Sequence, residues 1–381
     1  MPLHSTSRLI LIAGAIGVVS AVIYFGRQPG ETPSESLKIG ANLSLSGNSP
    51  YWSQQVKHGL DVAAALANQD TGSRRVELVY LDNQGEAKVG ISNFQRLVNI
   101  DKVSCVLTAH TYIANPQRAL AASSKVPLLA TIVSAVGFGA ENEWSFLDWP
   151  TQEQMAPATA QYAFEELGAR KVATLVVNDP YGLDGSRNFV RSFEALGGKI
   201  LSQVTIDNKD FDARDELLKA LDLKPDALFV VAREGALANA VRQARELGFR
   251  KSILGVNAFD SPVVWKAAGD AANGVIFSSS FLSTIDNAEH SAFERVYRAQ
   301  TKEEPDWVSL FGYSIGKYLI ASVRSANGDP EAIRKALGSL NEPSLRGAIH
   351  MNASREVAST LGLFKRVSGR NELLHKIEPL K

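Results

Sequence analysis

The sequence of 381 residues has few of the residues from which reactive or metal-binding sites are built. It contains one cysteine, Cys105, which excludes an intramolecular disulfide and a multi-cysteine metal site. Cys105 lies in an apolar run, where a small buried core residue is expected. The six histidines include no two at the spacing of a zinc-binding helix. The sequence therefore predicts no metal centre.

Nucleotide-binding and hydrolase motifs are missing as well. No GxGxxG follows an expected strand, and neither a P-loop nor a GxSxG nucleophile turn occurs. The 40 basic residues balance the 40 acidic residues, so no basic excess suggests a nucleic-acid partner. We expect no cofactor, no nucleic acid and no catalytic residues, and the composition is that of an ordinary globular protein.

One long apolar run stands at the N-terminus. Leu9–Phe25 carries no charge, and its length of about 17 residues is near the minimum for crossing a bilayer and also fits a signal-peptide core. Tyr24 and Phe25 leave small residues poorly placed for cleavage. We therefore favour an uncleaved signal anchor over 1–27, with a cleaved signal as the alternative. Residues 28–36 are rich in Pro, Gly, Ser and Glu and predict a tether.

From Leu37 onward, strand patterns alternate with helical ones. Short apolar runs such as Val103–Leu107 are typical of buried parallel strands, and Gln54–Asn68 has apolar residues at helical spacing. The alternation restarts after Trp149-Pro150, so we expect an α/β fold of two doubly wound parallel-sheet lobes. Ligands of such sheets bind beyond the carboxyl ends of the strands. The expected strands are Leu37–Leu43, Val76–Leu81, Val103–Leu107, Pro127–Ile132, Lys171–Val177, Leu201–Ile206, Ala227–Ala232, Ser252–Val256 and Gly274–Phe277.

Three segments give the chain a family resemblance. Lys38–Gly47 followed by Tyr51-Trp52, then Asp179–Gly182, then Val241–Gly248 resemble type I periplasmic binding proteins. The most similar subfamily is the leucine/isoleucine/valine-binding group, which serves ABC transporters. Each segment is moderately specific alone, but their order and spacing run from about residue 37 to the C-terminus.

The resemblance implies a domain organisation and a function. Two lobes would be joined by three crossovers, near Trp149-Pro150, Ser278-Ser279 and Leu345-Arg346. Lobe one would hold 37–149 and 279–345, and lobe two would hold 150–278 and 346–381. The chain would be an extracytoplasmic, monomeric receptor that captures a small solute for an ABC transporter permease or a sensor kinase, anchored to the inner membrane by its N-terminal helix.

The resemblance also implies a ligand site. Trp52 would line the cleft, although a packing role at a helix start is the alternative, and Thr111 or Tyr112 would give a hydroxyl to a ligand carboxylate. Ser134 is the expected donor of the next loop, and Tyr181 would cover the ligand unless it only builds a turn. The nine expected ligand-binding residues are Trp52, Thr111, Tyr112, Val133, Ser134, Ala135, Tyr181, Arg233 and Asn257.

Two of these residues depart from the amino-acid-binding relatives. Asn257 stands where they carry an acidic residue for the ligand ammonium, and Arg233 stands where many have an aromatic. An amide cannot offset a buried positive charge, whereas an arginine can hold a carboxylate. We therefore expect a carboxylate, an amide or another polar ligand without a free α-amine. The alternative for Arg233 is a salt bridge with Glu234 or Glu246.

Two rival functions remain open from the sequence. A hydrolase on the same scaffold would need a nucleophile–base pair in the cleft, for which His110 with Thr111 is the only weak candidate. A degenerate module that binds nothing is the other possibility.

Overall fold

The computed structural model describes residues 36–47, 50–207, 212–280, 287–358 and 360–378. The predicted anchor over 1–27 and nearly all of the predicted tether lie outside these ranges. Within them, no helix is long and apolar enough to cross a membrane.

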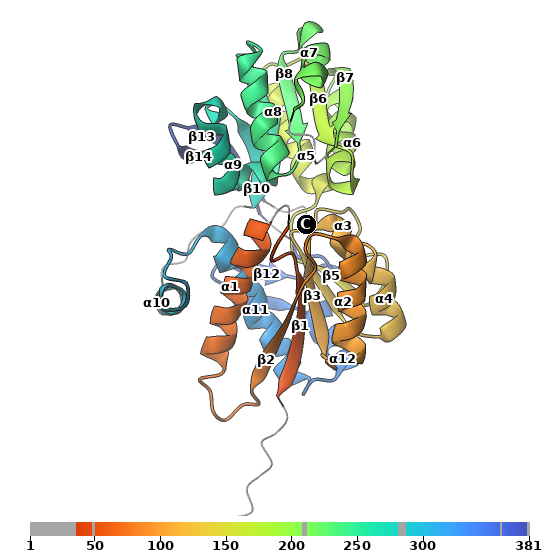
Figure 1. Ribbon diagram of the computed structural model, residues 1–381, viewed down its shortest axis with the longest axis vertical. Coiled ribbons are helices and arrows are strands. Elements are labelled where there is room, and N and C mark those ends of the chain that lie inside the picture. Colours follow the sequence, from red (N-terminus) through yellow and green to blue (C-terminus); the bar gives the residue numbers. More distant parts are fainter. Residues whose placement is uncertain (1–35, 48–49, 208–211, 281–286, 359, 379–381) are drawn as a thin grey trace, which may run out of the picture. The chain divides into compact units, whose positions relative to one another are not determined.

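The first lobe is built on a five-stranded, wholly parallel sheet with the order β2-β1-β3-β4-β5. The strands are β1 (Leu37–Leu43), β2 (Val76–Asp82), β3 (Cys105–Ala109), β4 (Leu128–Thr131) and β5 (Ser145–Leu147). The helices are α1 (Pro50–Ala67), α2 (Ala87–Asn99), α3 (Thr111–Ala114), α4 (Gln117–Ser124), α10 (Ala288–Thr301), α11 (Trp307–Ser325) and α12 (Pro330–Gly338). Figure 1 shows α1 and α11 on one side of this sheet and α2 and α4 on the other.

Two glycines allow α1 and α11 to pack closely. A Cβ atom added at Gly59 would lie 2.1 Å from the Ser309 carbonyl oxygen, and one at Gly312 would lie 2.5 Å from the Val56 carbonyl oxygen. Real Cβ contacts do not approach so near, so only glycine permits this backbone contact. The contact brings a C-terminal helix of the chain against the first helix and closes one face of the first lobe.

The second lobe contains a seven-stranded sheet with the order β14-β13-β10-β9-β8-β6-β7. The strands are β6 (Lys171–Val177), β7 (Lys199–Ile206), β8 (Ala227–Val231), β9 (Ser252–Gly255), β10 (Ile276–Ser280), β13 (Leu361–Val367) and β14 (Arg370–Ile377). The helices are α5 (Gln152–Glu165), α6 (Pro180–Ala195), α7 (Arg214–Asp222), α8 (Glu234–Glu246) and α9 (Pro262–Ala268), with 3-10 turns at Asn257–Asp260 and Gly269–Ala272.

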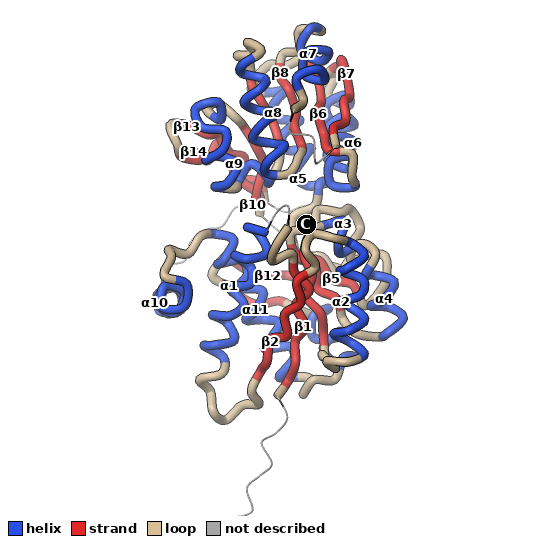
Figure 2. Tube along the Cα trace, viewed as in Figure 1, coloured by secondary structure: helices blue, strands red, loops and turns tan. Residues whose placement is uncertain are grey.

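This second sheet is mixed, which corrects the expectation of a wholly parallel one. Strands β6, β7, β8, β9 and β10 are parallel to one another, but β13 runs antiparallel to both β10 and β14. Figure 2 shows the strands of both lobes in red, with the helices around them in blue. Ser368 and Gly369, between the last two strands, both have positive φ, of 47° and 83°. This is the backbone of a tight two-residue hairpin turn, which makes the two strands antiparallel.

Two separate hydrophobic cores define the lobes, and the chain passes between them three times. The chain leaves the first core after Trp149 and enters the second at Met155. It returns to the first core between Phe277 and Phe293. It enters the second core again between Val357 and Leu361. The first two passages lie near the predicted crossovers.

The third crossover lies later than predicted. Ile349, Met351 and Val357 are buried in the first core, although we expected lobe two to begin at residue 346. The hairpin of β11 (Asn341–Ser344) and β12 (Gly347–His350) precedes the crossing, and Leu147 of β5 forms a bridge with Glu356. Pairing with the first sheet therefore retains this segment in lobe one.

Two local differences concern the segments that face the site. The helix expected over Ala114–Ser124 is divided into α3 and α4 at Pro116, because proline lacks the N–H that a continuous helix needs. Helix α6 begins at Pro180, earlier than the predicted Ser186. Asp179 caps this helix by accepting a hydrogen bond from the Gly182 N–H at 3.1 Å.

Candidate ligand-binding site

The site lies at the points where the strand order of each sheet reverses. In the first sheet the reversal is between β1 and β3, and in the second it is between β6 and β8. At such a point the loops after two neighbouring strands run to opposite sides of the sheet, and a crevice forms between them. A small cavity of about 40 Å³ lies there, with walls from both lobes. It is lined by Trp52, His110, Thr111, Ile132, Ser134, Tyr181, Ala232, Arg233, Glu234, Asn257 and Ala258.

The wall from the first lobe is held by polar loops and an aromatic cluster. The Thr111 hydroxyl accepts a hydrogen bond from the Ser134 N–H at 3.2 Å, which joins the loops after β3 and β4. Trp52 is 4% exposed and makes edge contacts with Trp149 and Trp307 at centroid distances of 6.1 and 5.7 Å. Trp52 thus packs in the first lobe and also lines the cavity. The two roles considered from the sequence, packing at a helix start and lining the cleft, are therefore compatible.

Strained backbone occurs in the same wall. His110 has φ of 67° and Ile132 has φ of 55°, both in the left-handed region. A branched residue such as isoleucine rarely adopts this conformation, which costs on the order of 1–3 kcal/mol. Such strain gathers at ligand sites in proteins, and it marks the two loops that carry Thr111 and Ser134.

The wall from the second lobe begins with the start of α6. Because Asp179 caps the helix and Pro180 occupies its first turn, Tyr181 is fixed beside the cavity and is 9% exposed. Its hydroxyl donates to Asn257 Oδ1 at 3.2 Å. Burial raises the pKa of Tyr181, so the hydroxyl retains its proton and remains a donor.

Arg233 is held by groups of the protein itself. Its guanidinium forms an ion pair with Asp179, and neither Glu246 nor a solvent-exposed partner takes that place. The guanidinium carbon lies 4.3 Å from the ring centre of Tyr112 and 5.9 Å from that of Tyr181. The charge of Arg233 is therefore matched within the site, and the carboxylate of Asp179 both caps α6 and anchors this side chain.

His110 is deeply buried and does not pair with Thr111. Its Nε2 atom lies 3.3 Å from the hydroxyl of Ser53, a residue of α1 with no exposed surface. Burial, with the nearby Arg233, lowers the pKa of His110 to about 3. A base this weak next to an inaccessible hydroxyl gives the hydrolase hypothesis no geometric support.

The predicted residues fall into two groups. The cavity lining includes six of them: Trp52, Thr111, Ser134, Tyr181, Arg233 and Asn257. Tyr112 is not part of the lining and lies against the Arg233 guanidinium, and Val133 and Ala135 are buried in the first core. Glu234, the first residue of α8, lines the cavity although the sequence suggested only a salt bridge for it. Acidic residues are common at helix starts, so the residue type and position of Glu234 did not indicate a place in the site.

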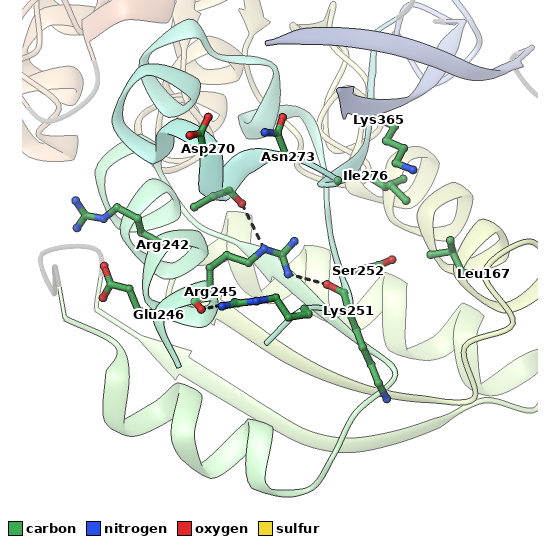
Figure 3. Close-up of a pocket in the computed structure, with 13 residues that line it drawn as sticks. Leu167, Arg242, Arg245, Glu246, Lys251, Ser252, Asp270, Asn273, Ile276 and Lys365 are labelled. Atoms are coloured by element: carbon green, nitrogen blue, oxygen red, sulfur yellow. Dashed lines mark hydrogen bonds between the residues drawn. The ribbon is translucent and has the colours of Figure 1, made fainter. Parts of the chain in front are cut away.

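A second cavity, of about 660 Å³, lies at the amino ends of β9 and β10, at the opposite end of these strands from Asn257 (Figure 3). Its central cation, Arg245, donates to the carbonyl oxygens of Phe249 and Lys251, each at 2.8 Å. These bonds tie the turn after α8 to the start of β9. The arginine at the centre of this cavity thus has a structural role.

In the part of the chain that the structure describes, no group of three or more His, Cys, Asp or Glu residues is arranged to hold an ion. Cys105 is buried in β3, and burial raises the pKa of its thiol to about 12. The polar side chains that line the cavity are three hydroxyls, one amide, the neutral imidazole of His110 and the two charged groups of Arg233 and Glu234.

Comparison with known proteins agrees with this architecture. The Leu/Ile/Val-binding protein homolog 2 of Brucella abortus is 23% identical over 317 residues, covering 81% of this chain and 84% of that protein. The branched-chain amino acid transporter substrate binding protein LivJ of Streptococcus pneumoniae, solved with isoleucine, has a TM-score of 0.82 at 23% identity, covering 91% of this chain and all of that one.

A solute binding protein of an ABC transporter from R. palustris, solved with benzoate, has a TM-score of 0.80 at 22% identity and covers 90% of this chain and 97% of that one. At these identities the structures establish the fold. The sequence pattern of the family described as periplasmic binding protein matches residues 36–369, nearly all of the described chain. The chain therefore belongs to the periplasmic binding protein family.

Proposed function

We propose that this protein is an extracytoplasmic receptor that binds a small polar, amino-acid-like solute between its lobes and passes it, unaltered, to an ABC transporter permease. The observation that carries the proposal is the cavity at the two strand-order reversals, lined by Thr111 and Ser134 from one lobe and by Tyr181, Arg233 and Asn257 from the other. A solute that touched both walls would stabilise the closed arrangement of the lobes.

The polar groups in the walls support a small ligand with a carboxylate or an amide. Thr111, Ser134 and Asn257 are buried residues, at 3%, 2% and 5% exposure, and all three line the cavity. The oxygens of Thr111 and Asn257 already accept hydrogen bonds within the protein, so a solute carboxylate or amide oxygen would bind the donors of these side chains. Isoleucine and benzoate, the ligands of two proteins with this fold, are both small carboxylates.

The size of the cavity supports a mechanism in which the lobes move. About 40 Å³ is space for roughly one or two water molecules, far below the 300–1,000 Å³ typical of small-molecule sites. An amino-acid-sized ligand would enter only after the lobes separate about the three crossovers. Closure over the solute would then form the surface that a permease recognises.

Family membership supports an extracytoplasmic location. We propose further that the apolar run Leu9–Phe25 acts as an uncleaved anchor and that 28–36 tethers the receptor to the inner membrane. A tether would keep the receptor near a permease and would also suit a sensor kinase as partner. Protease treatment of intact cells, followed by detection of the chain in membrane and soluble fractions, tests the anchor.

The function is tested by a thermal-shift screen of the full-length protein against amino acids, aliphatic and aromatic carboxylates and amides. A ligand that binds only the folded chain must raise its melting temperature. For the best solute, Tyr181→Ala is expected to weaken binding at least about tenfold by calorimetry, because a buried aromatic and a hydrogen bond are lost.

The matched control is Tyr162→Ala, a change to a second-lobe tyrosine whose ring lies against His375, away from the cavity. It is expected to leave the affinity unchanged. If no solute raises the melting temperature, the chain is a non-binding module, and if both variants bind alike, the site lies elsewhere.

A further inference from the structure

The cavity at the amino ends of β9 and β10 differs in size and chemistry from the one between the lobes. Its volume of about 660 Å³ falls within the 300–1,000 Å³ typical of small-molecule sites. Figure 3 shows Arg245 at its centre and Lys365 of β13 beside Ile276. Among the described residues that line it there is no aromatic ring, so it offers a nucleobase nothing to stack on. A ligand of this cavity would be recognised by charge and hydrogen bonds.

Positive charge predominates in the lining. The five lining cations are Arg242, Arg245, Arg250, Lys251 and Lys365. Lys251 is paired with Asp226 at 3.1 Å. Of the two lining carboxylates, that of Glu246 is paired with Arg214 at 3.0 Å. Within the described ranges the other four cations form no ion pair, and Asp270 is the one lining carboxylate left to offset them.

Arg245 is partly buried without a carboxylate beside it. Its guanidinium donates to the carbonyl oxygens of Phe249, Lys251 and Ala271, which are neutral acceptors. Arg250 donates to the carbonyl oxygen of Arg245, which brings a second guanidinium to the same turn. Burial and the charge of Arg250 lower the pKa of Arg245, and no acidic group of the described chain raises it. Two like charges are therefore held together, and an anion would relieve their repulsion.

The carboxyl end of α8 offsets only part of this charge. A helix end carries about half an elementary negative charge, which favours a cation such as Arg245 in the last turn. Arg250 and Lys365 follow from the next loop and from β13, and the helix end cannot match them as well. Arg242 donates to Asn239 Oδ1 at 2.7 Å, and Figure 3 shows its guanidinium turned away from Arg245, at the rim of the cavity.

We propose that this cavity binds a small phosphate-type anion, in a site separate from the solute site between the lobes. Arg250 and Lys365 supply the charge beside the fixed guanidinium of Arg245. Asn273 Oδ1 accepts from the Ser368 N–H at 3.1 Å, so its Nδ2 hydrogens are the donors that can face an anion. Planar guanidinium groups match pairs of phosphate oxygens, and a lysine adds a point charge. Inorganic phosphate and the phosphate of a lipid headgroup share this chemistry.

An anion in this site would join three segments of the second lobe. They are the turn after α8, the turn before β10, and β13. A ligand that binds only the folded chain raises its stability. The cavity lies at the opposite end of the strands from Asn257, so the anion and the solute would not compete.

The test uses inorganic phosphate and pyrophosphate as probes on the full-length protein, at constant ionic strength with chloride as the balancing anion. Both are expected to raise the melting temperature, pyrophosphate more because it carries more charge. The double variant Arg250→Gln/Lys365→Gln is expected to bind pyrophosphate at least about tenfold more weakly by calorimetry, because charged hydrogen bonds are lost. Arg245 stays unchanged because it holds the turn after α8.

The matched control is Lys199→Gln/Lys219→Gln, which removes two exposed cations of the same lobe outside the cavity. It is expected to bind pyrophosphate as the wild type does. An equal loss in both double variants would overturn the proposal, because the probe would then only screen charge. If the cavity variant fails to fold, Lys365→Gln alone is expected to weaken binding at least about threefold.

Vesicles of phosphatidylglycerol and of phosphatidylcholine distinguish the two sources of the phosphate. The comparison is between the wild type and the cavity variant, since both carry Leu9–Phe25. Weaker binding of the variant to phosphatidylglycerol vesicles, without an effect of free pyrophosphate, identifies a lipid headgroup as the ligand. If neither probe distinguishes the variant from the wild type, the proposal is overturned. The receptor function stands in either case, because none of the changed residues lines the cavity between the lobes.

Discussion

The guanidinium carbon of Arg233 lies 4.3 Å from the centre of the Tyr112 ring. Tyr112 belongs to the first lobe and Arg233 to the second, so the pair spans the edge of the cavity. A cation over an aromatic face contributes about 0.5–2 kcal/mol, more when water is excluded. In the proposed mechanism this contact between the lobes would favour their closed arrangement.

Replacing Tyr112 by leucine is expected to weaken solute binding by about threefold to thirtyfold, because closure loses this cation–ring contact. Tyr112→Phe keeps the ring and is expected to bind within about twofold of the wild type. Calorimetry on the three proteins measures the difference. Equal affinities for the leucine and phenylalanine variants would show that the contact does not contribute to closure.

His110 is expected to give the protein a characteristic loss of stability in acid. Its pKa of about 3 in the folded chain is below the usual value near 6.5, so between these values the unfolded chain binds a proton that the folded chain excludes. The free energy of unfolding therefore falls as the pH falls through this window, by about 1.4 kcal/mol per pH unit.

Urea unfolding of the wild type and of His110→Gln isolates this contribution from those of other groups. Between about pH 7 and pH 5 the wild type is expected to lose about 2 kcal/mol more than the variant. Ser53→Ala removes the contact to Nε2 but keeps His110 buried, and it should retain the wild-type slope. If the free energy of unfolding changed with pH in the same way for the wild type and His110→Gln, the burial of a neutral histidine would be contradicted.

The contact between α1 and α11 leaves no room for a methyl group. In Gly312→Ala the new Cβ would lie 2.5 Å from the Val56 carbonyl oxygen, so we expect a loss of about 1–3 kcal/mol in the free energy of unfolding. Gly338→Ala, also at a helical position but with open space around it, is expected to be neutral or stabilising by up to about 1 kcal/mol. Denaturant unfolding of both variants measures the two effects, and equal stabilities would argue against the close packing.

A buried ion pair secures the β11–β12 hairpin to the first lobe. Arg346 and Asp148 have side chains that are 6% and 0% exposed, and the Tyr318 hydroxyl donates to the same Asp148 oxygen at 2.8 Å. Arg346→Met leaves a buried carboxylate without its cation, which is expected to cost about 3–5 kcal/mol in unfolding free energy.

The comparison for this variant is Arg214→Met, which breaks an exposed pair and is expected to cost at most about 1 kcal/mol. Asp148→Leu combined with Arg346→Met is expected to recover much of the loss, because both charges are then removed. A cost below about 1 kcal/mol for Arg346→Met alone would mean that the hairpin is not held by this pair.

The parts of the fold that local patterns specify were predictable. Strands such as Leu37–Leu43 and Lys171–Val177 match the structure residue for residue, since each is a short apolar run bounded by polar or turn residues. The parallel order of these strands then indicated where the ligand-facing loops would meet. Six of the nine expected site residues line one cavity for that reason.

What could not be predicted depends on contacts between distant residues. Arg233 pairs with Asp179, 54 positions earlier, and nothing near either residue distinguishes that partner from Glu246. The lobe to which Met351 and Val357 belong could not be predicted either, because apolar side chains can pack in either core. The bridge between Leu147 and Glu356, which retains this segment in lobe one, joins residues far apart in the sequence. The third crossover was therefore placed too early.

The central claim is that a solute binds between the lobes, and a crystal structure of the full-length protein with its tightest solute tests it most directly. The account predicts the solute in contact with Ser134 of the first lobe and Tyr181 of the second. A solute found instead in the cavity beside Arg245, or one that contacts a single lobe, would contradict it.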